Sequence, residues 1–182
     1  MRAVMACLEN PPICYDEVAM SAKHIDACTD PKHHVHHAGE YVREVERACA
    51  ERGLRLTPLR AEVLRLVADA GQPVKAYDLL AKVSETKAAS APPTIYRALD
   101  FLLGNGFIHK LESINAFVAC HHPSVRHTVP FLICDGCHSA IEMEDEKIGS
   151  QLDQRARALG FTPQAQTLEV HGLCARCAGK SG

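Results

Sequence analysis

Four cysteines of this chain have a spacing typical of a metal site. They form two C-x-x-C pairs with 36 residues (138–173) between them, and the four residues are Cys134, Cys137, Cys174 and Cys177. Each pair places two thiolates where one ion can bind both, and two pairs complete a tetrahedral zinc site. A thioredoxin-like redox site would use one such pair before a helix in a βαβ unit, whereas both pairs here follow expected strands. The spacing therefore predicts a structural zinc ion that ties a central strand to the C-terminus.

A second, more scattered group of residues carries donor atoms that zinc also accepts. His109 lies in an expected hairpin, Cys120 follows it, His127 lies in the next loop, and Glu142 lies five residues beyond Cys137. Each has an ordinary alternative role, because a hairpin histidine is commonly exposed, a cysteine packs as a small apolar residue and a glutamate is usually solvated. Spacing alone therefore favours the ordinary roles over a metal site. Other histidines nearby are further candidates: His121, His122, His138 and His171.

The composition is that of an ordinary globular protein. Its 182 residues are 47% hydrophobic and 23% charged, enough for one compact domain or two small ones. No apolar run approaches the ~18 residues of a membrane span, and the apolar segment 3–8 is too short for a secretory leader. Nine cysteines cannot all pair as disulfides, and C-x-x-C pairs in a reducing compartment indicate metal binding. We therefore expect a cytoplasmic protein with no membrane partner.

Residues 1–38 differ from the rest of the chain. They lack sustained periodicity and contain three prolines and a histidine cluster, so we expect a mobile N-terminal extension. Its histidines and cysteines could bind metal, but an unstructured leader or a misassigned translation start is the favoured interpretation.

Hydrophobic periodicity and capping residues predict four helices in residues 39–113. Thr57 followed by Pro58 is an N-cap with proline at the first helical position. The expected helices run from Glu40 to about Gly53, from Pro58 to Gly71, around Tyr77 to Val83, and from Pro92 to Gly104. Segments 107–111 and 116–118 then flank a polar turn and predict a β-hairpin. Helices followed by a hairpin form the winged-helix arrangement of DNA-binding domains.

The last helix before the hairpin enters the major groove in winged-helix proteins, which makes its polar side a candidate DNA surface. Its apolar stripe leaves Thr94, Tyr96 and Arg97 on the opposite side. Arg97 is the candidate for a bidentate contact to guanine, with a phosphate contact as the alternative. Tyr77, Thr94 and Tyr96 could contact base edges or phosphates. Charge adds weak support, because the chain carries −2 overall but residues 39–113 are net positive by one.

Residues 114–182 are expected to form a small α/β dimerisation domain, which gives the whole chain an α+β fold. The predicted elements are strands at 128–134 and 140–143, a helix at 145–159, and a strand at 166–170. The apolar content is thin for such a unit, because small units bury proportionally little surface. A four-cysteine zinc site and association with a second copy would both compensate for that.

Several of these motifs resemble those of the ferric uptake regulator superfamily. They are the stretch Thr57-Pro58-Leu59-Arg60, the run from Pro93 to Asp100, the first cysteine pair, and the stretch from His171 to Cys177 that contains the second pair. The similarity covers residues 40–178, and the stretch 97–113 is most similar to the zinc uptake branch. The His-His-Asp-His motif of the iron branch is absent, since the equivalent stretch reads His127-Thr128-Val129-Pro130.

The resemblance implies a homodimer with about two zinc ions per chain and no small-molecule substrate. The four cysteines would hold a structural ion, and a regulatory ion at the hinge between the domains would take its ligands from His109, Cys120, His127 and Glu142. One thiolate, two imidazoles and one carboxylate make a tetrahedral zinc set, whereas an iron sensor is expected to use harder ligands. The implied function is a zinc-responsive transcriptional repressor that binds palindromic operator DNA as a zinc-loaded dimer and controls zinc uptake genes.

Two alternatives stay open. An iron or peroxide sensor of the same superfamily would differ in the metal that activates it, and a zinc storage or delivery protein would use the same sites without DNA. An enzyme is not expected, because nothing indicates an open catalytic zinc with a placed general base.

Overall fold

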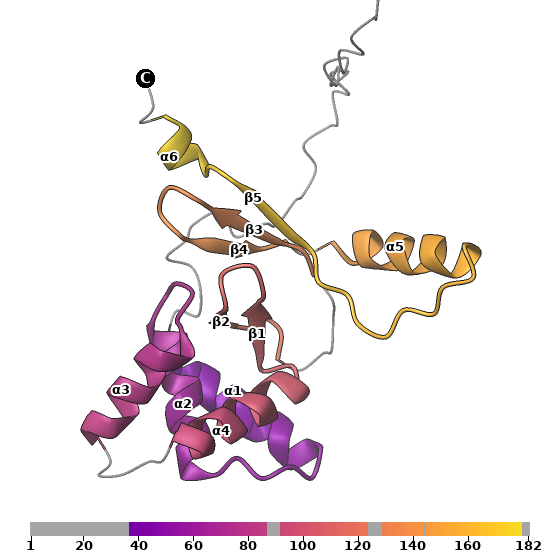
Figure 1. The fold of residues 1–182 in the computed structure, drawn as a ribbon. Coiled ribbons are helices and arrows are strands. Elements are labelled where there is room, and N and C mark those ends of the chain that lie inside the picture. The colour runs from indigo at the N-terminus through magenta and orange to yellow at the C-terminus, as the bar shows by residue number, and fades with distance from the viewer. Residues whose placement is uncertain (1–36, 87–91, 124–128, 144, 180–182) are drawn as a thin grey trace, which may run out of the picture.

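The computed structural model describes residues 37–86, 92–123, 129–143 and 145–179 (Figure 1). The segment 1–36, which is most of the predicted extension, and His127 lie outside the described residues. The helices are α1 (Ala38–Glu51), α2 (Pro58–Asp69), α3 (Ala76–Thr86), α4 (Pro92–Gly104), α5 (Glu146–Ala158) and α6 (Ala175–Ala178). The strands are β1 (Ile108–Leu111), β2 (Ala116–Ala119), β3 (Phe131–Cys134), β4 (Ala140–Glu142) and β5 (Glu169–Gly172). None of the described helices is long and apolar enough to cross a membrane.

Local sequence signals account for the first four helices, here called the helical unit. Helix α2 begins as predicted, with Pro58 as its first residue and the Thr57 hydroxyl accepting the backbone N–H of Arg60 at 3.4 Å. Helix α4 ends at Gly104, and Gly106 follows with a φ of 74°, a left-handed conformation that favours glycine. Helix α1 begins at Ala38, two residues earlier than expected, so the last residue of the predicted extension already belongs to a helix.

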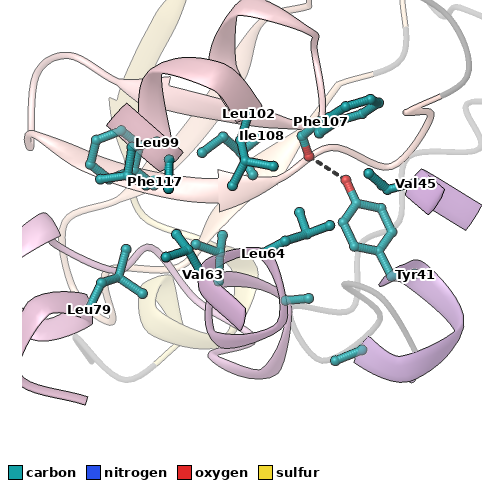
Figure 2. Close-up of a cluster of buried hydrophobic side chains, with 14 of the residues drawn as sticks. Tyr41, Val45, Val63, Leu64, Leu79, Leu99, Leu102, Phe107, Ile108 and Phe117 are labelled. Carbon is teal, nitrogen blue, oxygen red and sulfur yellow. Dashed lines mark hydrogen bonds between the residues drawn. The ribbon is translucent and has the colours of Figure 1, made fainter. Parts of the chain in front are cut away.

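The helical unit has one apolar core, in which α2 contacts both α1 and α4 (Figure 2). Ile95, Leu99 and Leu102 of α4 are almost completely buried there, and Phe107 joins them from the start of the hairpin. Burying one such side chain stabilises the fold by roughly 1.5–3 kcal/mol. The core therefore fixes which side of α4 faces outward.

The hairpin formed by β1 and β2, here called the wing, lies between the helices and the second sheet (Figure 1). Its strands are antiparallel, and Asn115 in the turn has a φ of 48°, which asparagine tolerates well. Backbone hydrogen bonds of 2.8 and 2.9 Å join Phe117 of β2 to Val74, which lies two residues before the start of α3. On the other side, Leu111 packs against residues of β3 and β4. The wing thus contacts both parts of the protein.

The remaining elements, β3 to α6, form the C-terminal unit. Its sheet has the order β4-β3-β5, with β3 antiparallel to β4 and parallel to β5. Phe131 of β3 is paired with Glu142 on one side and with Glu169 on the other. Strand β5 begins at Glu169, three residues after the expected start, and α6 was not predicted. Both segments are largely exposed and lack a regular apolar pattern, so periodicity does not define the bounds of β5 and does not reveal α6.

Candidate metal centres and DNA-facing helix

The four cysteines predicted to bind zinc lie together in the C-terminal unit. Their sulfur atoms all lie within 4.8 Å of one another, and the four residues are Cys134, Cys137, Cys174 and Cys177. The Sγ atoms of Cys137 and Cys174 are 3.8 Å apart. A tetrahedral ion with Zn–S bonds of about 2.3 Å holds its sulfurs about 3.8 Å from one another. The spacing of this four-cysteine cluster therefore fits zinc.

The fold brings the two cysteine pairs together through the parallel strands. Cys134, the last residue of β3, lies opposite Gly172, the last residue of β5. The second cysteine pair begins two residues after Gly172 and therefore lies beside the first cysteine pair. Gly136, between Cys134 and Cys137, lies so close to Cys177 that a Cβ atom there would be 3.2 Å from its Sγ. A larger residue at position 136 would require Cys177 to shift by a few tenths of an ångström.

Hydrogen bonds already favour the charged form of two of these thiols. The Ser139 hydroxyl, 3.2 Å from the Cys137 sulfur, is the largest cause that lowers the pKa of Cys137 to about 5. The backbone N–H of Cys174 donates to the Cys134 sulfur at 3.3 Å and lowers the pKa of that thiol. In contrast, the hydrogen bond with Cys174 and burial raise the pKa of Cys177 to about 12. A bound cation is needed to deprotonate the whole set, which would release protons as it binds.

Three members of the second predicted set also lie together, at the junction of the wing and the C-terminal sheet. Donor atoms of His109, Cys120 and Glu142 all lie within 4.8 Å of one another, and His109 Nε2 is 3.9 Å from a Glu142 oxygen. We call this group the hinge cluster. His127, the fourth predicted ligand, lies outside the described residues.

The ordinary roles weighed for these residues are wrong for Glu142 and for His109. Glu142 is 2% exposed and so is not a solvated carboxylate, and His109 is half-buried. A carboxylate taken out of water requires positive charge or hydrogen bonds nearby, and the Glu142 side chain accepts the backbone N–H of His121 at 3.2 Å. Cys120 is completely buried. Such a buried set of thiol, imidazole and carboxylate is suited to bind a divalent ion.

Tyr41 of α1 and Arg52, the residue that follows α1, hold backbone groups near the hinge cluster, and the sequence did not predict either role. The Tyr41 hydroxyl donates to the carbonyl oxygen of Phe107 (Figure 2) and accepts the backbone N–H of Cys120 at 3.1 Å. Burial, followed by the nearby Cys120, raises the pKa of Tyr41 well above its usual value. Arg52 donates to the carbonyl oxygens of Asn105 at 3.0 Å and Pro123 at 2.8 Å. The sequence offers one signal for the role of Tyr41, which is its position on the apolar face of α1, because a buried tyrosine hydroxyl usually has a hydrogen-bond partner.

Two of the other candidate histidines, His138 and His171, lie outside both metal-binding clusters. His138 lies in the turn after the first cysteine pair with a φ of 59°, and His171 contacts Asp135 and Ser113. Within the described ranges, only the four-cysteine cluster and the hinge cluster bring three or more metal-binding side chains together.

The residues predicted to contact DNA are all on the outside of the helical unit. Thr94, Tyr96 and Arg97 are exposed on α4, on the side opposite its buried stripe. Tyr77, near the start of α3, is 79% exposed. Both tyrosines are therefore accessible for contact with a partner.

Comparison with known proteins places these features in a family. The ferric uptake regulator family matches residues 51–171. The zinc uptake regulation protein of Escherichia coli (strain K12) is 43% identical over 139 residues, which are 76% of this chain and 81% of that protein. The crystal structure of holo XcZur is 72% identical with a TM-score of 0.73, covering 77% of this chain and 98% of that one. A zinc uptake regulator complexed with zinc and DNA is 42% identical with a TM-score of 0.75, covering 79% and 96%. By sequence and by fold, this chain belongs to the ferric uptake regulator family.

Proposed function

We propose that this chain is a zinc-responsive transcriptional repressor that binds palindromic operator DNA as a zinc-loaded homodimer and controls zinc uptake genes. The observation that carries the proposal is the hinge cluster, because His109 comes from the wing and Glu142 from the C-terminal sheet. The relatives support it, since one is a zinc uptake regulation protein and another was solved with zinc and DNA.

Two zinc ions per chain fit the donor atoms available. The four-cysteine cluster would hold the structural ion, and His109, Cys120, Glu142 and His127 would hold the regulatory ion. When bound, zinc supplies positive charge that offsets the buried carboxylate and thiolate of the hinge. An iron sensor would be expected to rely on nitrogen and oxygen donors, so the buried thiol of Cys120 favours zinc.

Regulation follows from where the hinge ligands are anchored. His109 and Glu142 can ligate one ion only when the wing and the sheet adopt one relative position. The ligated state therefore selects one orientation of the helical unit, and with it the direction in which α4 points. In a dimer this selects the spacing between two copies of α4, which must match two half-sites on DNA.

The C-terminal unit offers the surface for the second copy. Among the described residues, every large aliphatic or phenylalanine side chain that is exposed belongs to this unit; they are Leu132, Leu152, Leu159, Phe161, Val170 and Leu173. Leu132 and Val170 are paired across β3 and β5, and they alternate with Phe131, which packs under the wing. The sheet thus has a second apolar face, which a partner copy would cover.

The expected division of the chain is part of the same proposal. A DNA-binding domain at 39–113 precedes a dimerisation domain at 114–182, after an extension at 1–38 whose last residue already belongs to α1.

The test is DNA binding by the full chain under defined metal. Duplexes that the protein selects from a random pool in zinc are labelled, and fluorescence anisotropy is then measured with zinc, Fe(II), Mn(II) or chelator. We expect tight binding with zinc alone, selected half-sites about one helical turn apart, and two zinc ions per chain by elemental analysis. Activation by Fe(II) alone would identify an iron sensor, and two bound zinc ions without any selected DNA would identify a storage protein.

A further inference from the structure

A carboxylate of the C-terminal sheet holds the turn of the wing. The two oxygens of Glu169, the first residue of β5, accept the backbone N–H groups of Glu112 at 2.6 Å and Ser113 at 3.0 Å. Burial raises the pKa of Glu169, but the hydrogen bonds from Ser113 and Glu112 outweigh it and keep the pKa below its usual value. Glu169 is therefore a charged partner of the wing turn.

His171, two residues further along β5, adds a second link to the same turn. Its Nε2 lies 2.8 Å from Ser113 Oγ, and its Nδ1 lies 2.9 Å from Asp135 Oδ1. Asp135 directly follows Cys134, and its backbone N–H donates to the carbonyl oxygen of Gly172 at 2.8 Å. The wing turn is thereby connected through β5 to the turn that carries the first cysteine pair.

The contacts link a serine, a histidine and an aspartate as in a serine hydrolase triad; the residues are Ser113, His171 and Asp135. Their surroundings oppose that chemistry. A triad requires backbone N–H groups aimed at the oxyanion that develops on the substrate. Here the N–H groups of Glu112 and Ser113 already donate to the Glu169 carboxylate, whose negative charge would repel an oxyanion. The arrangement therefore holds the wing.

The register of the sheet places this contact beside the hinge cluster. Glu142, Phe131 and Glu169 form one row across β4, β3 and β5, and side chains in a row point to the same face. Glu142 lies next to His109, and the Phe131 ring is 5.2 Å from the His109 ring. One row of the sheet therefore meets the wing at two separate places, the hinge cluster and the turn.

We propose that Glu169 and His171 form a metal-independent brace, which sets the orientation of the wing at which the hinge cluster binds zinc. The proposal rests on the function proposed above, because the brace affects regulation only if hinge zinc controls DNA binding. An attachment at the hinge cluster alone leaves rotation about that point, and a second attachment at the turn restricts it. Glu169 and His171 are positioning residues, which act through the wing and not as ligands.

Loss of the brace should lower the apparent affinity of the hinge cluster for zinc. That affinity falls in proportion to the fraction of molecules that already have the competent orientation. Glu169→Gln keeps the shape of the side chain but removes its charge and turns an NH₂ group toward one of the two N–H donors. Because Glu169 is partly exposed, we expect a loss of about three- to tenfold and not more.

The test compares the full-length parent with Glu169→Gln and Asp153→Asn, each with the four-cysteine cluster loaded. Asp153→Asn is the matched control, because it removes the same charge from an exposed ion pair with Arg157 on α5. Competition with a chelator gives the zinc midpoint of the hinge cluster, and hydrogen–deuterium exchange follows the wing turn at 112–115. In Glu169→Gln we expect a midpoint raised about three- to tenfold and faster exchange in the turn, with structural zinc and dimer mass unchanged. The control should match the parent in all four measurements.

Two outcomes would overturn the proposal: an unchanged midpoint in Glu169→Gln, or a parent whose wing turn becomes protected only after hinge zinc binds. If Glu169→Gln fails to fold, the test uses His171→Asn, which removes only the link through His171. His171→Asn should also raise the zinc midpoint, and an unchanged midpoint in this variant would overturn the brace. A parent that binds selected DNA without hinge zinc would refute the proposed function instead. The exchange and zinc measurements use no DNA, so they test the brace whether or not the proposed function is correct.

Discussion

Tyr41→Phe should weaken zinc binding at the hinge cluster, although Tyr41 is not a ligand. Its hydroxyl joins the Phe107 carbonyl oxygen to the backbone N–H of Cys120, and the substitution deletes both hydrogen bonds. The Cys120 N–H keeps a contact of 3.2 Å with the Phe107 oxygen, so the two groups partly satisfy each other. A lost hydrogen bond costs about 1 kcal/mol, and a buried group left without a partner costs up to about 3 kcal/mol. We therefore expect the free energy of unfolding to fall by about 1–3 kcal/mol.

The effect on zinc has a separate cause. Tyr41 fixes the backbone of Cys120, and removing a group that orients a metal ligand typically costs about 10–100-fold in metal affinity. Tyr41 acts on the backbone of Cys120 and not on its sulfur, so the lower end applies. The expected change is about tenfold, equivalent to about 1.4 kcal/mol.

Chelator competition measures the zinc midpoint of the hinge cluster, and urea unfolding measures stability. Tyr77→Phe is the matched control, because it removes the same atom from a tyrosine that is 79% exposed, and it should change neither quantity. If Tyr41→Phe lowered stability while its zinc midpoint equalled that of the parent, Tyr41 would be a core residue without a positioning role. Equal midpoint shifts in both variants would also refute the reasoning.

Three further predictions concern the ligands, the DNA surface and pH. Cys120→Ser should leave a folded dimer that no longer responds to zinc. Cys137→Ser should instead unfold or monomerise the C-terminal unit, because structural zinc contributes on the order of 10 kcal/mol. Size-exclusion chromatography and DNA titration distinguish the two variants. Arg97→Ala should lose roughly 1–3 kcal/mol of preference for selected over random DNA and keep both zinc ions, while an equal loss on all sequences would assign Arg97 to a phosphate. The lowered pKa of Glu169 means that its stabilising contribution is complete above the usual value of 4.5 and is lost as pH falls through the lowered value. The difference in unfolding free energy between the parent and Glu169→Gln should therefore disappear in acid, and a difference that persists there contradicts the charge-based explanation.

The helical unit is predictable from the sequence because its signals are local. Thr57 and Pro58 mark the start of α2, and Gly104 marks the end of α4, each within one turn of the boundary it defines. The four-cysteine cluster is predictable for a related reason, since the chemistry of two C-x-x-C pairs leaves few alternatives to a shared ion.

The hinge cluster is different, because pairings between distant segments assemble it. Glu142 is buried through the register of β4 with β3, which spacing along the chain does not reveal. Tyr41 lies four residues before Val45 on the buried face of α1, but the backbone group that it holds is 79 residues away. The family resemblance pointed to Glu142 as a candidate ligand, which residue spacing alone did not, and neither pointed to Tyr41.

Parallel pairing between β3 and β5 imposes an order on the folding of the growing chain. Cys134 pairs with Gly172, and the intervening segment must close before either cysteine pair meets the other. The helical unit and the wing, by contrast, are complete once the segment up to position 120 has been made, and domains fold as units from the N-terminus during synthesis. A nascent chain that stops before β5 has α4, the candidate recognition helix, but neither a full set of thiols nor the Glu169 carboxylate that contacts the wing. The ability to respond to metal is therefore the last property that the chain acquires as it is made.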